Sequence, residues 1–260
     1  MKNIAIINTK GGVGKSTLAF HVLPAILADI KNFSILEIDN NNKTTTAFSN
    51  TQILKGKITS VNIDEGMQRL EELVINNMLD EDKISVIDAG GGDDSLKVIH
   101  SFIESDLIAD TLFIIPFMPD FVQLTNLLDT YNVLPDTAKI LVVLNNADLS
   151  DADHLMFVKG NEDYEIPNIS TIFPHFAVCP KSPLFSYSAS RNKETIKDLA
   201  LLASQYNQKE ILDYAKVKTK GDKNKMTMIY RNWKISRNAK DYLESEAIAQ
   251  LKSIILGEQA

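Results

Sequence analysis

Residues 3–17 read NIAIINTKGGVGKST, an apolar run followed by a glycine-rich stretch that ends in Lys-Ser-Thr. The apolar run has the β-branched composition of a buried strand, and a helical pattern follows the glycines. Glycines let the backbone turn tightly and point successive N–H groups inward, which creates a concave nest for anionic oxygens. The positive N-terminal end of the following helix adds to this attraction. These residues therefore predict a phosphate-binding loop between a strand and a helix.

Two side chains of this loop are expected to contact a nucleotide and its metal ion. Lys15 is placed to reach the β- and γ-phosphates, and the Ser16 hydroxyl is placed to coordinate Mg²⁺. Compared with the usual pattern G-x-x-x-x-G-K-[ST], Thr9 replaces the first glycine, and Lys10 stands beside it. The residues of the loop that are expected to bind ATP are Lys10, Gly11, Gly12, Val13, Gly14, Lys15, Ser16 and Thr17.

Short apolar runs, bounded by turn residues and separated by helical patterns, continue along the chain. The expected strands are 3–8, 34–38, 84–87, 111–116 and 139–144, with a weaker sixth at 169–173. The expected helices are 15–30, 64–79, 96–105, 121–134 and 151–158. This alternation predicts an α/β fold of the P-loop NTPase type, with a mostly parallel sheet, helices on both faces and a helical C-terminal extension. Ligands of such sheets lie at the carboxyl ends of the strands.

An acidic residue ends the third expected strand, and three glycines follow it. Asp88 lies at the end of a buried strand beside the phosphate loop, so it is placed to hold Mg²⁺ or its water, as a metal ligand together with Ser16. The glycines at 90–92 permit a close backbone approach to a γ-phosphate and provide a hinge. Asp93 and Asp94 come next, and they either act in this loop or only cap the helix that follows.

The composition excludes several other classes of protein. The chain has 260 residues, of which 44% are hydrophobic and 23% charged, as in ordinary soluble globular proteins. No apolar run approaches the roughly 20 residues of a membrane span, and the N-terminus has no signal-peptide pattern. One cysteine, Cys179, excludes an internal disulfide framework, a cysteine-rich zinc site and a cysteine-ligated iron–sulfur cluster within one subunit. We therefore expect a cytoplasmic protein without a membrane span.

Charge is distributed unevenly along the chain. The net charge is −7, but residues 216–240 hold nine basic residues and one acid, which leaves residues 1–215 strongly acidic. The polar, lysine-rich stretch 216–225 is the best candidate for a domain boundary. We expect a domain at 1–215, and a basic linker and C-terminal helical segment at 216–260. The basic segment could bind DNA phosphates nonspecifically, form a solvated linker or dock an acidic partner.

The sequence from Lys10 to Ser16, KGGVGKS, resembles the deviant Walker A motif of the ParA/MinD family of ATPases. That family includes plasmid and chromosome partition ATPases and division-site regulators, and the resemblance covers roughly residues 1–215. It implies that Lys10 reaches across to the phosphates of the other subunit in an ATP-sandwich dimer. A second cation near the β–γ bridge stabilises the charge that develops in phosphoryl transfer, as an arginine finger does. The catalytic residues that the resemblance implies are Lys10, Lys15 and Asp39.

The role of Asp39 depends on how the end of the second strand is aligned. The family usually has Asp-x-Asp-Pro-Gln here, so that Glu37 and Asp39 match the two acids, and Asp39 helps to orient the attacking water. Asn40 and Asn41 then replace Pro-Gln, which bears on how the loop is held and how fast hydrolysis runs. A second alignment places Asp39 on the first acid and Asn41 at the water-positioning place. We prefer the first alignment because it retains both acids.

The resemblance also points to residues on the base side of the nucleotide. Asn145 is similar to the strand-end asparagine whose amide meets the adenine, and it is the last residue expected to bind ATP. Residues 180–184 fall where the family has its base-side loop. The glycines after Asp88 look more like those of the plasmid-stability and conjugation-associated branch, the StbB/TraL-like proteins.

The phosphate-loop residues together with the resemblance imply a Mg²⁺-ATP-dependent, dimerising switch ATPase that hydrolyses ATP to ADP and phosphate. Its expected task is the partition or positioning of plasmid DNA or another cargo, together with a DNA-binding adaptor protein. One alternative is an ATP-dependent biosynthetic enzyme on the same scaffold, similar to dethiobiotin synthetase, against which Lys10 argues. Another is a nucleotide-binding scaffold with little turnover, which the missing Pro-Gln after Asp39 suggests.

Overall fold

The computed structural model describes residues 1–30, 32–39, 45–48, 51–62, 68, 70, 72, 75–76, 79–80, 82–188 and 193–257. Its centre is a seven-stranded sheet with the order β3-β2-β4-β1-β5-β6-β7, and each neighbouring pair of strands is parallel. The strands are β1 (Asn3–Ile6), β2 (Asn32–Ile38), β3 (Ile58–Val61), β4 (Lys83–Ala89), β5 (Thr111–Phe117), β6 (Lys139–Ala147) and β7 (Phe176–Pro180). The expected α/β fold with a parallel sheet is confirmed.

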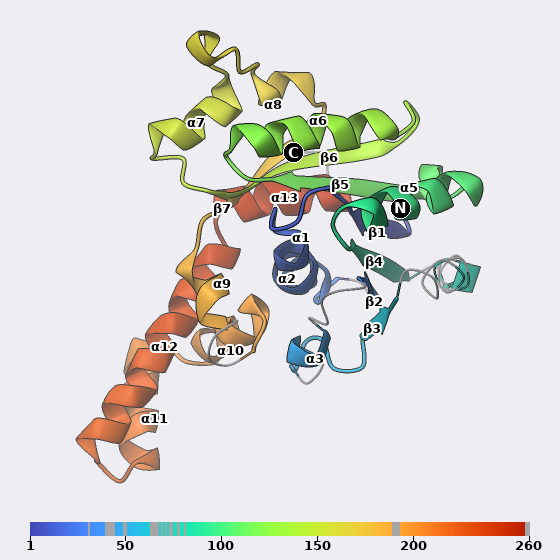
Figure 1. The fold of residues 1–260 in the computed structure, drawn as a ribbon. Coiled ribbons are helices and arrows are strands. Elements are labelled where there is room, and N and C mark those ends of the chain that lie inside the picture. The colour runs from blue at the N-terminus through green and yellow to red at the C-terminus, as the bar shows by residue number, and fades with distance from the viewer. Residues whose placement is uncertain are drawn as a thin grey trace.

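Helices cover both faces of the sheet (Figure 1). One face carries α5 (Asp93–Glu104), α6 (Phe121–Val133), α7 (Ala152–Lys159) and α8 (Ile169–Ile172). The other face carries α1 (Lys15–Thr17), a π-helical segment (Leu18–Val22), α2 (Leu23–Leu27), α3 (Thr45–Phe48) and α13 (Glu246–Leu256). The remaining helices are α9 (Pro183–Tyr187), α10 (Ile196–Gln205), α11 (Gln208–Lys218) and α12 (Lys223–Leu243).

The core consists of two apolar layers, one on each face of the sheet. In β1, Ala5 contributes to the layer under α5 and α6, whereas Ile4 and Ile6 contribute to the layer under α1 and α2. Successive side chains of a strand point to opposite faces, so a strand covered on both sides must be apolar throughout. This explains why β1, β5 and β6 are recognisable in the sequence as continuous apolar runs.

The expectation of a strand at 169–173 is wrong, because these residues form the short helix α8. Prolines at 167 and 174 bound the segment, and the Asn168 carbonyl accepts the amides of Thr171 and Ile172 in a helical turn. The edge of the sheet is instead formed by β7, which the sequence did not reveal, and β3 at the opposite edge was also not predicted. The helix expected at 64–79 lies largely outside the described residues.

The helices α10, α11 and α12, residues 196–243, form an arm that extends away from the sheet (Figure 1). Trp233 of α12 is buried in the arm, and its indole Nε1 donates to the Tyr206 carbonyl at 2.8 Å. The stretch 216–225 forms the end of α11, a short turn and the start of α12. The division of the chain at residue 215 stays a prediction. After the arm, α13 returns and packs on β7.

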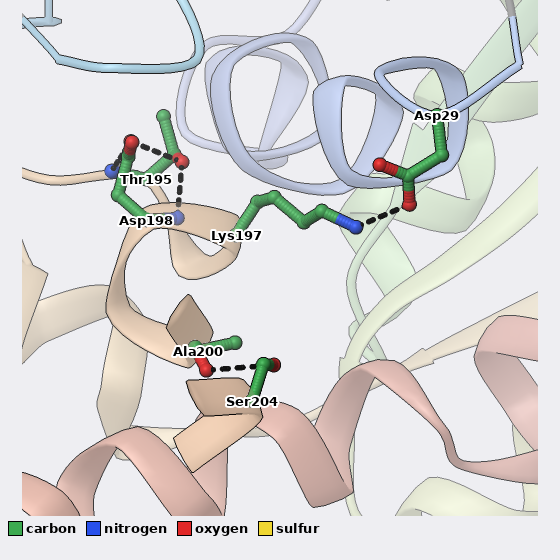
Figure 2. Close-up of polar contacts among 6 residues, drawn as sticks. All are labelled: Asp29, Thr195, Lys197, Asp198, Ala200 and Ser204. Carbon is green, nitrogen blue, oxygen red and sulfur yellow. Dashed lines mark hydrogen bonds and ion pairs between the residues drawn. The ribbon is translucent and has the colours of Figure 1, made fainter. Parts of the chain in front are cut away.

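The base of the arm is fixed to the helix that follows the phosphate loop (Figure 2). Lys197 of α10 forms an ion pair with Asp29, just after α2. Thr195 and Asp198 form a capping box at the start of α10, and Asp198 also accepts the Ile53 amide at 3.1 Å. The arm is therefore joined at its base to elements that follow the first and second strands.

Candidate functional site

A cavity of about 280 Å³ opens at the carboxyl ends of β1, β2 and β4, beside the start of α1. It brings together segments that are far apart in the sequence, as ligand sites of parallel sheets do. Its lining residues are Gly11, Gly12, Gly14, Lys15, Ser16, Thr17, Asp39, Asp88, Ala89, Gly90 and Gly91. Three predicted site residues, Lys10, Val13 and Asn145, do not line this cavity.

The loop after β1 needs glycine at two positions. Gly12 has a φ of +79° and Gly14 a φ of +95°, a region that residues with a side chain rarely adopt. Gly14 also has no space for a side chain, because a Cβ would lie 1.8 Å from Nδ2 of Asn145. The Asn145 amide donates to the Val13 carbonyl at 3.0 Å, so this residue of β6 braces the loop. Its contact with adenine stays a prediction.

Lys15 is buried, and backbone carbonyls of its own loop hold its ammonium group. Nζ donates to the Asn8 carbonyl at 3.0 Å and to the Lys10 carbonyl at 2.8 Å. Burial lowers the pKa of Lys15, although the charges of Asp88, Asp39 and Asp94 act in the opposite direction. A buried cation held by neutral carbonyls gains electrostatic energy when an anionic phosphate comes within reach.

Ser16 and Asp88 meet on the cavity wall, where the Ser16 hydroxyl hydrogen-bonds to the Asp88 carboxylate. Asp88 is buried, and among the described residues its Oδ1 has no hydrogen-bond partner. Burial raises the pKa of Asp88 to about 7, while the bond from Ser16 and the charge of Lys15 act against this rise. Hydroxyl and carboxylate oxygens are the ligands that Mg²⁺ prefers, and the unpartnered Oδ1 would gain one. The two residues therefore fit a magnesium ion.

The glycine loop after β4 lies directly against the phosphate loop. The Gly92 amide donates to the Thr9 carbonyl at 2.6 Å, and the Gly90 amide donates to the Ile38 carbonyl at 2.7 Å. A Cβ on Gly91 would lie only 3.2 Å from the Gly11 nitrogen. The glycines thus allow the two loops to approach closely, while their predicted approach to a γ-phosphate and their predicted role as a hinge stay predictions.

Asp93 and Asp94 are the first two residues of α5 rather than its N-cap, which is Gly92. Neither forms a side-chain cap, but both lie in the first turn, where negative charge is favourable at a helix N-terminus. The expectation that they cap the helix is therefore wrong, and an action of either residue in the loop stays a prediction.

Three polar residues that the sequence analysis missed hold these loops together. Ser95 of α5 donates to the Gly90 carbonyl at 2.7 Å and accepts the Asn8 amide at 3.2 Å. Thr130 of α6 accepts the Thr9 amide at 3.3 Å. The Asn8 carboxamide accepts the amide of residue 10 at 2.7 Å and donates to the carbonyl of residue 116 at 2.8 Å. Only Asn8 had a signal in the sequence, as a polar residue that ends an apolar strand.

A second cavity, of about 670 Å³, opens at the carboxyl ends of β6 and β7. The side chain of Asn145 contacts the phosphate loop, and the next residue, Asn146, lines this second cavity. Residues from the stretch 180–184, which the resemblance placed on the base side of a nucleotide, also contribute. The lining residues are Asn146, Ala147, Asp148, Leu149, Pro180, Lys181, Ser182, Pro183 and Ser186.

Within the described residues, no group of three or more His, Cys, Asp or Glu side chains could hold a metal ion. Every helix in that part of the chain is too short or too polar to cross a membrane.

A parallel sheet with a glycine loop, a buried lysine and a strand-end aspartate in one cavity defines a P-loop nucleotide-binding domain. The chain belongs to the family described as the CobQ/CobB/MinD/ParA nucleotide binding domain, which matches residues 4–202. The expected relation to ParA/MinD proteins is confirmed. The closer relation to StbB/TraL-like proteins stays a prediction. No curated protein sequence matches the chain.

Solved structures with the same fold include proteins of this family. The MinC:MinD cell division complex of Aquifex aeolicus has a TM-score of 0.55 at 16% identity, and the alignment covers 100% of this chain and 98% of that one. A plasmid partition protein of Borrelia burgdorferi bound to AMPPNP has a TM-score of 0.53 at 14% identity, with 88% and 98% covered. Apo McdA of Cyanothece has a TM-score of 0.52 at 14% identity, with 74% and 90% covered. At these identities the similarity shows the fold alone.

Proposed function

We propose that the protein is a switch ATPase of the ParA/MinD type, which binds Mg²⁺-ATP, dimerises and hydrolyses ATP to ADP and phosphate. The observation that carries the proposal is the cavity in which Lys15, Ser16 and Asp88 meet the glycine loop and Asp39. Membership of the CobQ/CobB/MinD/ParA family supports it, as does the likeness in fold to a partition protein bound to AMPPNP.

Each group around the cavity has a distinct part in this proposal. The loop amides and Lys15 bind the phosphates, with Lys15 leaving its carbonyl partners as the anion arrives. Ser16 and Asp88 hold Mg²⁺, which when bound neutralises phosphate charge during the transfer. Asp39, half-buried on the cavity wall after β2, orients the attacking water. Asn41, the alternative candidate for this role, lies outside the described residues.

Lys10 is proposed to act on the second subunit rather than on its own nucleotide. Its side chain is exposed and does not line the cavity of its own chain. Its backbone is fixed on both sides, because its amide donates to Asn8 Oδ1 and its carbonyl accepts from Lys15 Nζ. A fixed backbone with an outward side chain suits a cation that reaches across an interface, where it would stabilise developing charge.

The test is the oligomeric state with nucleotide, measured by gel filtration with light scattering. Asp39→Ala should slow hydrolysis, so that the ATP-bound form accumulates as a dimer. Adding Lys10→Ala to that variant should return it to a monomer that still binds ATP. Lys55→Ala, at another exposed lysine, should leave the dimer intact and serves as the control. A monomer in Asp39→Ala with saturating Mg²⁺-ATP would contradict the dimer proposal.

ADP formation by the unmodified chain tests the proposed hydrolysis of ATP. Slow turnover that rises with DNA or an adaptor protein is the expected result. ATP binding without any ADP, even with those partners present, would identify a nucleotide-binding scaffold instead. Stimulation by a small carboxylate metabolite would identify a biosynthetic enzyme.

We further propose that the cargo is DNA, contacted nonspecifically through the arm. Arg231, Lys234 and Arg237 of α12 are exposed and lie three residues apart, on one side of the helix. Such a stripe can neutralise phosphates of a DNA backbone with release of counterions. The acidic body opposes nonspecific contact elsewhere on the molecule, which would restrict DNA to the arm.

A further inference from the structure

Tyr242, near the end of α12, reaches from the arm to the carboxyl end of β7. Its hydroxyl donates to the Pro180 carbonyl at 3.1 Å and lies 3.3 Å from the sulfur of Cys179. Burial raises the pKa of the Cys179 thiol to about 11, so the thiol keeps its proton at neutral pH. The Tyr242 hydroxyl has one proton, which it donates to the Pro180 carbonyl. The Cys179 thiol is therefore the donor in its hydrogen bond with the Tyr242 oxygen.

The same thiol is also connected to β6. The backbone N–H of Asn146 hydrogen-bonds to the Cys179 sulfur. Asn146 sits at the register shift between β6 and β7, and its φ of +56° is unusual for a residue with a side chain. A hydrogen-bond chain therefore runs from Asn146 through Cys179 and Tyr242 to Pro180. Its two ends, Asn146 and Pro180, line the 670 Å³ cavity.

The ring of Tyr242 makes a second connection, toward the phosphate-binding loop. It packs edge-on against Phe185 of α9, with the ring centroids 5.6 Å apart. Phe185 in turn packs against His21 of the π-helical segment at 5.5 Å, and His21 packs against Phe48 of α3 at 5.0 Å. These rings lie in or beside the apolar layer between the sheet and the first helix.

We propose that Tyr242 is a positioning residue through which the arm fixes the base side of the nucleotide site. It acts through Cys179 on Asn146 and directly on Pro180, and both of these residues line the cavity. The inference rests on the proposed function, in that the 670 Å³ cavity is taken to hold the nucleoside part of ATP. It adds that the arm contributes to nucleotide affinity although its helices line neither nucleotide cavity.

The test compares Tyr242→Phe with the unmodified protein, by calorimetric titration with ATP and with tripolyphosphate, which has no base. The variant keeps the ring against Phe185 and loses only the hydroxyl. We expect ATP to bind roughly three- to tenfold more weakly, the equivalent of about one hydrogen bond, and tripolyphosphate to bind unchanged. The control is Tyr230→Phe, another hydroxyl of α12, which accepts a hydrogen bond from Gln208 within the arm. A purely structural role would not produce this difference between the two ligands.

A second variant and a nucleotide-free measurement make the outcome decisive. Cys179→Ala should weaken ATP binding in the same direction, and the double variant should lose less than the two effects combined, because both changes break one chain. In the protein without nucleotide, Tyr242→Phe should speed amide exchange at residues 145–148 and 181–187, and Tyr230→Phe should not. An unchanged ratio of ATP to tripolyphosphate affinity overturns this inference alone. Failure of the unmodified protein to bind either ligand overturns the proposed function as well.

Discussion

Asp88 is a buried carboxyl group whose charge is costly until a cation binds beside it. Its pKa in the folded protein is about 7, above its ordinary value of 3.8, because burial disfavours the charged form. The folded chain therefore holds a proton between about pH 4 and pH 7 that the unfolded chain releases. By linkage, this group favours the folded state at acidic pH and loses that contribution as pH rises through 7.

We predict that Asp88→Asn raises the melting temperature of the metal-free protein by several degrees at pH 8. The amide cannot ionise, so the variant avoids a cost of up to about 4 kcal/mol, and the gain should shrink as pH falls toward 5. Thermal unfolding from pH 5 to 8 in EDTA measures it. Mg²⁺ with ATP should stabilise the unmodified protein more than the variant. A gain that is the same at every pH would contradict the assignment.

At Gly14, the left-handed backbone and the approach of Asn145 both exclude a side chain. Gly14→Ala should destabilise the protein by at least about 1–2 kcal/mol from the backbone conformation alone and abolish ATP binding. Gly11→Ala is the matched control for the free energy of unfolding alone, because a Cβ there would meet no atom within 4 Å and its φ is not positive. Denaturant unfolding measures both variants, and ATP titration measures Gly14→Ala. An equal loss of unfolding free energy in both variants would show that the positive φ of Gly14 does not cause the destabilisation.

On the scale of single elements, the first helix contains an irregularity beside the nucleotide site. Its middle, Leu18–Val22, is π-helical, and it carries the buried His21 between Phe48 and Phe185. Burial lowers the pKa of His21 to about 4, below its ordinary value of 6.5. The unfolded chain therefore binds a proton between pH 6.5 and 4 that the folded chain excludes, so stability falls as pH falls through this range.

We predict that His21→Leu removes this part of the acid sensitivity. The difference in unfolding free energy between the variant and the unmodified protein should move in favour of the variant from pH 7 to pH 4.5. His100→Leu, at an exposed histidine of α5, should show no such trend. Chemical denaturation at several pH values measures both variants. The absence of any trend for His21→Leu would mean that the ring is protonated without cost in the folded state.

The elements also show what the sequence could reveal. The central strands were predictable because burial on both faces requires a continuous apolar run, as in β5 and β6. Which of the two segments 169–173 and β7 forms the edge strand was not predictable. Both are short and apolar, and only pairing with β6 distinguishes them. The same contrast holds for the site. Lys15 and Ser16 were predictable because they are adjacent in one motif. Ser95 and Tyr242 act as single residues that the fold brings in from distant helices, so nothing local marks them.

On the scale of the whole molecule, opposite charges are separated between the arm and the body. The basic residues of 216–240 lie on α11, α12 and the turn between them, which project away from the sheet (Figure 1). The base of the arm is joined to the turn after α2 by Lys197 and Asp29, and to β7 by Tyr242 near the end of α12. The proposed DNA-contacting surface is therefore remote from the nucleotide but connected to it by specific contacts.

This separation predicts how salt affects DNA binding. With Mg²⁺-ATP and Asp39→Ala to maintain the dimer, the affinity for random-sequence duplex should fall linearly with salt on a double logarithmic plot. Replacing Lys234 and Arg237 with alanine should reduce the magnitude of the slope by about 2 per subunit, because each contact with a phosphate releases about one counterion. The control replaces Lys83 and Lys139, which begin β4 and β6 at the amino ends of the parallel strands. It removes the same charge, so a slope that changes equally in both double variants would mean that net charge, and not the arm, sets the affinity.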